Sequence, residues 1–191
     1  PDMCRPFSAT RNGMVQGEGA AVFVFEDMDR ARARGARVLA EVAGFGMTSD
    51  AEDIVRPSQV GAERAMRAAL QDAGLRSGDV GYINAHGTGT KLNDSTESAA
   101  IRAVFDSPPP VSSTKAMHGH LMGATGAVEL LAVIMALRDG YVAPTVGFEA
   151  VDPECALDVV PNVGRHVVVD VALSNAFAFG GLNAVLALRR A

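Results

Sequence analysis

Short apolar runs alternate with amphipathic stretches along the 191 residues of this chain. Apolar runs of about four to eight residues are typical of β-strands, whereas apolar residues that recur every third or fourth position are typical of helices. We therefore expect strands within segments 15–26, 38–46, 80–84, 111–114, 167–173 and 182–188. We expect helices at 28–34, 58–73, 94–105 and 121–137.

Residues that favour helix ends support these boundaries. Asp27 precedes the first helix as an N-cap, and Gly35 ends it. Gly74 closes the second helix in the same way. Asp94 and Glu97 stand early in the third helix, where the helix dipole favours acidic side chains.

The segment 121–137 is apolar on nearly every face, which predicts a central, buried helix. Gly123, Gly126 and Ala127 would let other backbone pack closely against its first turns. Strands and helices alternate along the chain until two strands follow each other near the end. This order predicts an α/β fold with a mixed β-sheet covered by helices and a buried central helix layer.

Between the last two strands lies Asn175–Gly181, which is too rich in glycine and aromatic residues to be an ordinary hairpin turn. Phe177 and Phe179 alternate there with small residues. They are either two core aromatics or a movable lid beside a ligand channel, since Gly180 and Gly181 permit backbone change.

Composition narrows the class of protein. Hydrophobic residues make up 48% and charged residues 20%, as in ordinary globular domains, so we expect one domain over residues 1–191. The net charge of −5 and the absence of a basic run argue against nucleic-acid binding. No apolar stretch is long enough to span a bilayer.

The cysteines indicate the redox setting of the protein, and the N-terminus indicates whether the chain is part of a longer protein. Cys4 and Cys155 are far apart and lack CxxC spacing, which favours a reducing, cytoplasmic setting over a disulfide scaffold. The segment Pro1–Pro6 begins like the middle of a loop, without an initiating Met or a signal-peptide pattern. We expect the chain to be a piece of a longer protein or the product of a cleavage.

Candidate chemistry gathers in two glycine-rich segments. His86-Gly-Thr-Gly-Thr90 follows the predicted strand 80–84, and Ser112-Ser-Thr-Lys115 runs into Gly119-His120 after the next strand. Ligands in α/β sheets bind outside the carboxyl ends of the strands, so both histidines should reach the same rim. Two neutral imidazoles that each donate an N–H would suit an oxyanion or enolate.

Other residues could complete this site. The hydroxyls of Thr88 and Thr90 could bind a ligand amide or carbonyl. Glu129 interrupts the apolar helix and needs a partner if it is buried, and Lys115 is the obvious one. Such a pair would also hold the loop that carries His120.

Simpler interpretations remain open at this point. Each histidine could be a hydrogen-bonded structural residue, and the first motif could be only a tight turn into a helix. A metal site is less favoured. His118-Gly-His120 has a ligand-like spacing, but the carboxylates of Asp94 and Glu97 already have a capping explanation.

With these motifs assembled, the chain resembles a β-ketoacyl-acyl-carrier-protein synthase, an elongating condensing enzyme of bacterial type II systems and the thiolase superfamily. The resemblance runs through Arg5-Pro-Phe7, Gly17-Glu-Gly19, Asn84–Thr90, Ser112–Lys115, Gly119–Ala124 and Asn175–Asn183. Because it covers essentially the whole chain with several ordered motifs, it is highly specific. It implies a thiolase-like fold, of which this chain would be the C-terminal half.

The resemblance implies a decarboxylative Claisen condensation in fatty acid or polyketide biosynthesis. His86 and His120 match the family's catalytic histidines, and Lys115 matches the motif's lysine with Glu129 as its partner. No cofactor or metal is implied beyond the phosphopantetheine of an acyl carrier protein. The complete enzyme would be a dimer.

Five further positions match family residues near the substrate or its carrier. By the resemblance, Thr88 and Thr90 would meet the phosphopantetheine arm. Phe177 and Phe179 would form the aromatic loop over the site, with Phe179 as the gate. Arg11 would lie near the carrier-protein docking surface.

The chain also departs from the family pattern. The family's nucleophilic cysteine belongs to an N-terminal half, and neither Cys4 nor Cys155 has its sequence context, so we interpret both as structural. Ala178 stands where the family has glycine, and His118 where it often has threonine. We expect the missing half, or a complementary subunit, to be a partner. Two alternatives are a chain-length-factor-like subunit without catalysis and a malonyl-thioester decarboxylase.

Overall fold

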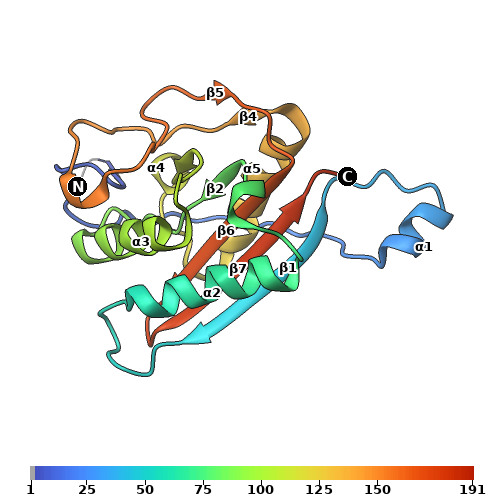
Figure 1. The fold of residues 1–191 in the computed structure, drawn as a ribbon. Helices are drawn as coiled ribbons and strands as arrows, with labels where there is room; N and C mark the ends of the chain where they lie inside the picture. Colours follow the sequence, from blue (N-terminus) through green and yellow to red (C-terminus); the bar gives the residue numbers. More distant parts are fainter. Residues whose placement is uncertain (1–2) are drawn as a thin grey trace.

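The structure, a computed structural model, describes residues 3–191 as a mixed β-sheet with helices on both faces (Figure 1). The sheet has the strand order β1-β7-β6-β2-β3, and a separate two-stranded sheet joins β4 to β5. The predicted mixed sheet covered by helices is confirmed. In chain order the elements are α1 Met28–Ala33, β1 Glu41–Ser49, α2 Gln59–Asp72, β2 Tyr82–Asn84, α3 Lys91–Val104, β3 Val111–Ser112, α4 Lys115–His118, α5 Thr125–Asp139, β4 Tyr141–Val142, β5 Arg165–His166, β6 Val171–Ala178 and β7 Leu182–Arg189.

The sheet combines both kinds of strand pairing. β1 pairs antiparallel with β7, and β7 with β6, whereas β2 runs parallel to both β6 and β3. The carboxyl ends of β2 and β3 therefore lie next to each other, with Asn84 opposite Ser112. This register places the loops that follow the two strands at one edge of the molecule.

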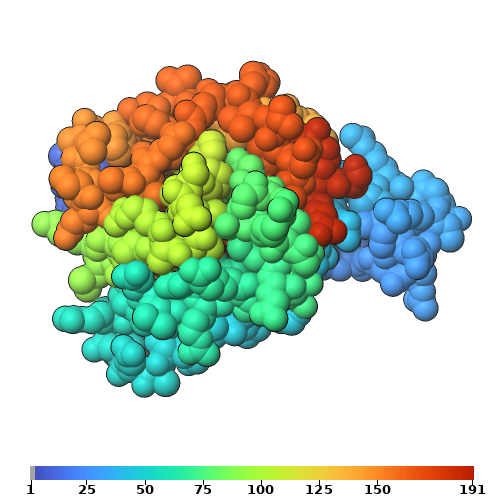
Figure 2. Space-filling model, in the orientation of Figure 1, coloured from blue at the N-terminus to red at the C-terminus, as the bar shows by residue number. Residues whose placement is uncertain are grey.

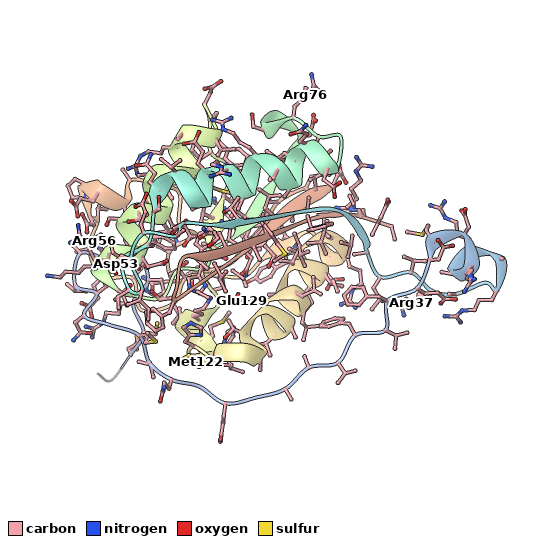
Figure 3. All side chains as sticks on the ribbon, turned by 90° about the horizontal axis from the view of Figure 1, so that it is seen from below. Arg37, Asp53, Arg56, Arg76, Met122 and Glu129 are labelled. Carbon is pink, nitrogen blue, oxygen red and sulfur yellow. The ribbon has the colours of Figure 1, made fainter. Side chains whose placement is uncertain are left out.

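Helices α2 and α5 cover opposite faces of the sheet, as the view from below shows (Figure 3). α2 packs directly onto β1, where Gly44 and Gly46 face it. A Cβ atom added at Gly46 would lie 2.1 Å from the carbonyl oxygen of Ala65 in α2, so only glycine allows this approach. Ser58, the first residue of the predicted helix 58–73, caps α2 through its side chain, which accepts the N–H of Gly61.

α5 is the expected central helix, although one side of it is partly exposed to solvent. Leu130, Val133 and Leu137 are buried against β6 and β2, and Glu129 is fully buried with them. Leu131 and Met135 are about half exposed, at 50% and 46%. Among residues 3–191, none of the helices is long and apolar enough to cross a membrane.

The predicted strand at 15–26 is wrong for the described chain. The segment is extended, but its only bridge is the one that joins Gln16 to His120. Phe23 packs against the α5 side of the core, while Val22 and Val24 are 91% and 90% exposed. Buried and exposed side chains alternate in this segment as in a β-strand, but no neighbouring strand of the described chain pairs with the segment. Figure 2 shows α1, which follows this segment, projecting from the main body.

Other boundaries differ from the prediction as well: β1 spans Glu41–Ser49 instead of 38–46, and α5 begins at Thr125 instead of 121. α3 begins at Lys91 instead of 94, because the side chain of Thr90 caps it by accepting the N–H of Asn93. β6 begins at Val171 instead of 167 and continues through Ala178. Since Ala178 pairs with Leu182, the glycine- and aromatic-rich segment is mostly strand, and only a short turn remains between β6 and β7.

Candidate active site

The two histidine motifs meet at the edge formed by β2 and β3. His86 lies two residues beyond the end of β2, and Lys115 begins the short helix α4 after β3. The imidazole rings of His86 and His120 are 5.4 Å apart between centroids and meet edge to face at 83°. The expectation that both histidines reach one rim is confirmed.

Local hydrogen bonds fix the tautomer of His120. Its Nδ1 lies 3.2 Å from the backbone N–H of Met122 and 3.0 Å from the hydroxyl of Thr125. A backbone N–H can only donate, so Nδ1 is an acceptor and the proton of the neutral ring is on Nε2. Met122 lies at the start of the α5 region, below the sheet in Figure 3. His120 therefore offers one N–H donor from a ring held at its other nitrogen.

His86 is buried, but its ring makes no hydrogen bond within the described chain. Within residues 3–191, its Nδ1 is buried without a hydrogen-bond partner, and no group bonds its other ring nitrogen. Its backbone is held, because the N–H of His86 donates to Glu97 at 2.8 Å. The ring is thus fixed by its backbone and by packing, and its N–H is not used by the chain.

Both catalytic candidates favour the neutral form. Burial lowers the pKa of His86 well below the usual value, and the charges of Lys115 and His120 add to this effect. Burial, followed by the charges of Lys115 and His118, lowers the pKa of His120 to about 4. The main causes for His120 are therefore burial and the nearby lysine. The prediction of two neutral imidazoles is consistent with these shifts.

Lys115 and Glu129 form the predicted buried pair. Both side chains are fully buried, and the Lys115 Nζ lies 2.5 Å from the Glu129 Oε1. Glu129 points from α5 toward the sheet (Figure 3). Burial raises the pKa of Glu129 to about 7, and the lysine opposes this shift. Since Lys115 is enclosed, it acts on the histidines through its charge and by holding α4 to α5.

The structure gives Glu97 a role that its position in the sequence did not indicate. This residue is 1% exposed, and its two carboxylate oxygens accept the backbone N–H groups of His86 and Gly87, each at 2.8 Å. The side-chain amide of Asn175 donates to the same carboxylate at 3.0 Å. Glu97 therefore joins α3, β6 and the loop that carries His86.

Asp94 holds the next part of the same loop. Its Oδ1 accepts the N–H groups of Thr88 at 3.0 Å and Gly89 at 3.3 Å, and its Oδ2 accepts that of Phe7 at 2.8 Å. Burial raises the pKa of Asp94 to about 6. Four successive backbone amides of the first motif are thus bound by two buried carboxylates. Asp94 does lie in the first turn of α3, but the residue that caps this helix is Thr90, so capping does not account for the two acids. The spacing of three residues, which puts both acids on one helix face, was the available signal.

The two threonines of the motif contact each other. Their hydroxyls are 2.9 Å apart, and the Thr90 hydroxyl also accepts the N–H of Asn93. Thr88 is buried, and Thr90 is half-buried. Their proposed contact with a substrate arm stays a prediction.

The two phenylalanines occupy different settings. Phe177 is buried, and its ring lies 5.8 Å from that of His86. Phe179 is 64% exposed in the turn between β6 and β7. Ala178 lies between them in a regular strand, so its extra methyl group is accommodated without a positive φ. Phe177 therefore lines the site directly, whereas the gating role of Phe179 stays a prediction.

Neither cysteine has the environment of a nucleophile. Both are free and buried, and the thiol of Cys4 donates to the carbonyl oxygen of Thr88 at 3.4 Å. Burial raises the pKa of Cys4 and raises that of Cys155 to about 11. Both thiols are therefore protonated at neutral pH, in line with structural roles.

The expected docking role of Arg11 is wrong for this structure. Its side chain is 2% exposed and forms an ion pair with Asp152. It also donates to the backbone oxygens of Ser8, Thr90 and Lys91. Because the guanidinium is enclosed, Arg11 stabilises the N-terminal segment and the start of α3 and presents nothing to a partner.

The family comparison identifies a domain that matches more than half of the chain. Residues 39–149 match the "Beta-ketoacyl synthase, C-terminal domain". Among the curated relatives, nodulation protein E of Rhizobium sp. (strain N33) is 54% identical over all of this chain and 48% of its own length. The 3-oxoacyl-[acyl-carrier-protein] synthase 2 of Staphylococcus aureus (strain COL) is 46% identical over 98% of this chain and 46% of its own length. The chain thus spans about half the length of these relatives.

Solved structures share the fold. The ishigamide ketosynthase/chain length factor superposes with a TM-score of 0.98 at 45% identity, covering 100% of this chain and 48% of that one. A type II polyketide synthase acyl-carrier protein in complex with its ketosynthase gives a TM-score of 0.93 at 32% identity, covering 99% and 48%. The α/β architecture is therefore thiolase-like, as the sequence predicted.

Proposed function

Because this chain belongs to the β-ketoacyl synthase family, we propose that it supplies the decarboxylation half of a condensing active site. The proposed reaction is carbon–carbon bond formation between malonyl-carrier protein and an acyl thioester, in fatty acid or polyketide synthesis. One observation carries the proposal: the rings of His86 and His120 meet edge to face, with centroids 5.4 Å apart, at the rim of the sheet.

The paired rings suit an enolate oxygen. When a malonyl thioester loses carbon dioxide, the electrons of the breaking carbon–carbon bond move into the thioester carbonyl, and its oxygen becomes negative. The Nε2–H of His120 and the unused N–H of His86 would donate to that oxygen. Donors held in place before the reaction stabilise developing charge without a cost of reorganisation, which is worth roughly 100- to 1,000-fold in rate for each donor.

The surroundings of the rings support this role. Burial, followed by the charge of Lys115, lowers the pKa of both histidines, so the rings stay neutral and donate hydrogen bonds without transferring a proton. Phe177 places an apolar ring beside His86. An apolar wall disfavours a charged carboxylate and favours its departure as neutral carbon dioxide.

The enolate carbon would then attack an acyl group held as a thioester. Cys4 and Cys155 are buried thiols with raised pKa values and do not fit that task. We propose that the acyl group is carried by a cysteine of a complementary half or subunit. The acyl carrier protein would deliver malonyl on its phosphopantetheine arm, with Thr88 and Thr90 as its contacts.

Reconstitution tests this proposal. The chain is assayed with acyl- and malonyl-carrier protein, alone and together with the cysteine-bearing N-terminal half of a ketoacyl synthase relative. We expect condensation product only from the combination. Product from the chain alone would contradict the proposal, because the chain would then hold its own nucleophile.

The same assay separates the alternatives. Carbon dioxide release without condensation, even with the second half present, would indicate a decarboxylase. No turnover of malonyl-carrier protein in any combination would favour a chain-length-factor-like subunit. The intact pair of histidines with its buried lysine argues against the latter.

A further inference from the structure

His118 lies next to the candidate active site, but the proposed chemistry gives it no role. Its Nδ1 lies 2.8 Å from the carbonyl oxygen of Gly119, and its Nε2 lies 3.1 Å from the hydroxyl of Thr114. A carbonyl oxygen only accepts, so Nδ1 carries the proton. Burial lowers the pKa of His118 and keeps the ring neutral, so Nε2 accepts the hydroxyl proton of Thr114. Both ring nitrogens are therefore used, which leaves none for a ligand.

The contact with Gly119 fixes the peptide that leads into His120. The carbonyl of Gly119 and the N–H of His120 belong to the same planar peptide unit. His118 holds the carbonyl, and the carbonyl oxygen of Val15 accepts the N–H at 2.7 Å. Both edges of this peptide are thus bound, and its orientation determines where the Cα and ring of His120 lie.

This peptide needs such a restraint because a glycine precedes it. Gly119 ends α4 with φ 73° and ψ −172°, a conformation that other residues rarely adopt. A glycine imposes little steric restriction, so a rotation of the following peptide would cost little without other contacts. The segment on the other side is close as well: a Cβ atom added at Gly17 would lie 2.0 Å from the carbonyl oxygen of His118.

Through its second ring nitrogen, Nε2, His118 is connected to the sheet by way of Thr114. The hydroxyl of Thr114 accepts the side-chain amide of Asn84 at 3.4 Å. The same amide lies 3.2 Å from the hydroxyl of Tyr82, which is buried in β2. A continuous chain of hydrogen bonds therefore connects the strand that precedes His86 to the peptide that precedes His120.

We propose that His118 is a positioning residue for His120, and that its Nδ1–H holds the Gly119–His120 peptide in the orientation that points the His120 ring at His86. The catalytic consequence rests on the proposed function, whereas the effect on the position of His120 does not. His118 does not touch the reacting atoms and acts only through this peptide.

Three substitutions separate positioning from packing. His118→Asn keeps an N–H at the position of Nδ1, whereas His118→Gln places its amide one bond farther out, toward Thr114. His118→Phe fills the space without either hydrogen bond. His166→Asn, at the exposed strand β5, is the matched control. Each variant is made in the chain combined with the cysteine-bearing half.

The first readout is the imidazole ¹⁵N spectrum. In the unsubstituted chain we expect opposite tautomers, with the proton on Nδ1 of His118 and on Nε2 of His120. His118→Asn and His166→Asn should leave the His120 signals in place, and His118→Gln and His118→Phe should shift them. Unchanged His120 signals in His118→Phe would overturn the proposal.

The second readout is carbon dioxide release from malonyl-carrier protein. We expect kcat to fall roughly tenfold or more in His118→Phe and His118→Gln with KM changed little, because small displacements of a catalytic group cost rate rather than binding. His118→Asn should retain most of kcat. Equal losses in all three variants, in proportion to stability, would show that His118 only packs. If no protein releases carbon dioxide, the proposed function fails, while the spectra still decide the role of His118.

Discussion

The imidazole rings of His86 and His120 meet edge to face with 5.4 Å between their centroids, although they follow different strands. Parallel pairing of β2 with β3 brings their loops together. Two buried carboxylates hold the first loop, and a lysine–glutamate pair anchors the second. The site thus consists of two N–H donors on a rigid frame, and the frame can be tested piece by piece.

The low pKa of His120 predicts an unusual acid dependence. We expect the ring to stay neutral until about pH 4, whereas a free histidine protonates near about pH 6.5. Between these values the unfolded chain binds a proton that the folded chain does not, so stability should fall as pH decreases through this window. Titration of the His120 ¹⁵N signals gives the pKa directly. Thr125→Val removes one hydrogen-bond donor to Nδ1 of His120, which should raise the pKa of this ring. A His120 midpoint near 6.5 would contradict the structure.

The Lys115–Glu129 pair predicts a change in the pH dependence of stability. In Lys115→Met the carboxyl of Glu129 loses its partner, so its pKa in the folded chain should rise further above the unfolded value. Stability should then decrease as pH rises from about 4.3, the unfolded pKa. The double variant Lys115→Met/Glu129→Gln should lose this slope. Urea unfolding at several pH values measures how the free energy of unfolding depends on pH. The same dependence in the single and the double variant would disprove the coupling between Lys115 and Glu129.

Glu97→Gln tests the restraint on the His86 loop. One carboxylate oxygen becomes an NH₂ group that faces a backbone donor, which should lower the free energy of unfolding by about 1–3 kcal/mol. Hydrogen exchange at the backbone amides of His86 and Gly87 should also be faster in this variant. Glu63→Gln, on the exposed side of α2, is the control and should change stability by less than about 1 kcal/mol. Unchanged exchange at both loop amides would show that Glu97 does not hold the loop.

Arg11 should be important for stability and not for docking. Arg11→Met leaves the buried carboxylate of Asp94 and the partly buried carboxylate of Asp152 without their cation. This loss should lower the free energy of unfolding by about 3–5 kcal/mol. Arg30→Met, at an exposed position of α1, should cost little. Where the variant is still folded, its affinity for carrier protein should equal that of the unsubstituted chain. A selective loss of carrier binding at unchanged stability would restore the docking interpretation.

Local patterns in the sequence were sufficient for most of the fold. The capping residue Asp27 marked the start of α1, the amphipathic segment closed by Gly74 became α2, and the apolar segment before Asp139 became α5. These signals act within a few residues, so they can be interpreted without knowing the tertiary contacts. The pairing of Lys115 with Glu129 followed from the cost of a buried unpaired charge.

Other features depended on contacts that local patterns do not contain. The segment with Val22 and Val24 has the alternation of a strand, but a strand also needs a neighbour. Asp94 and Glu97 looked like acids at a helix start, and only the tertiary fold shows that backbone amides surround them. Arg11 looked like a surface residue for the same reason, because its acidic partner Asp152 is distant in the sequence.

In the proposed reaction, His86 and His120 together stabilise an enolate oxygen. The decisive measurement is the release of carbon dioxide from malonyl-carrier protein by the chain combined with a cysteine-bearing half. We predict that His86→Ala and His120→Ala each reduce the rate by roughly 100-fold or more. The double variant should lose little beyond either single one, because the two donors act on the same oxygen. Carbon dioxide release at the unsubstituted rate in either single variant would contradict the account.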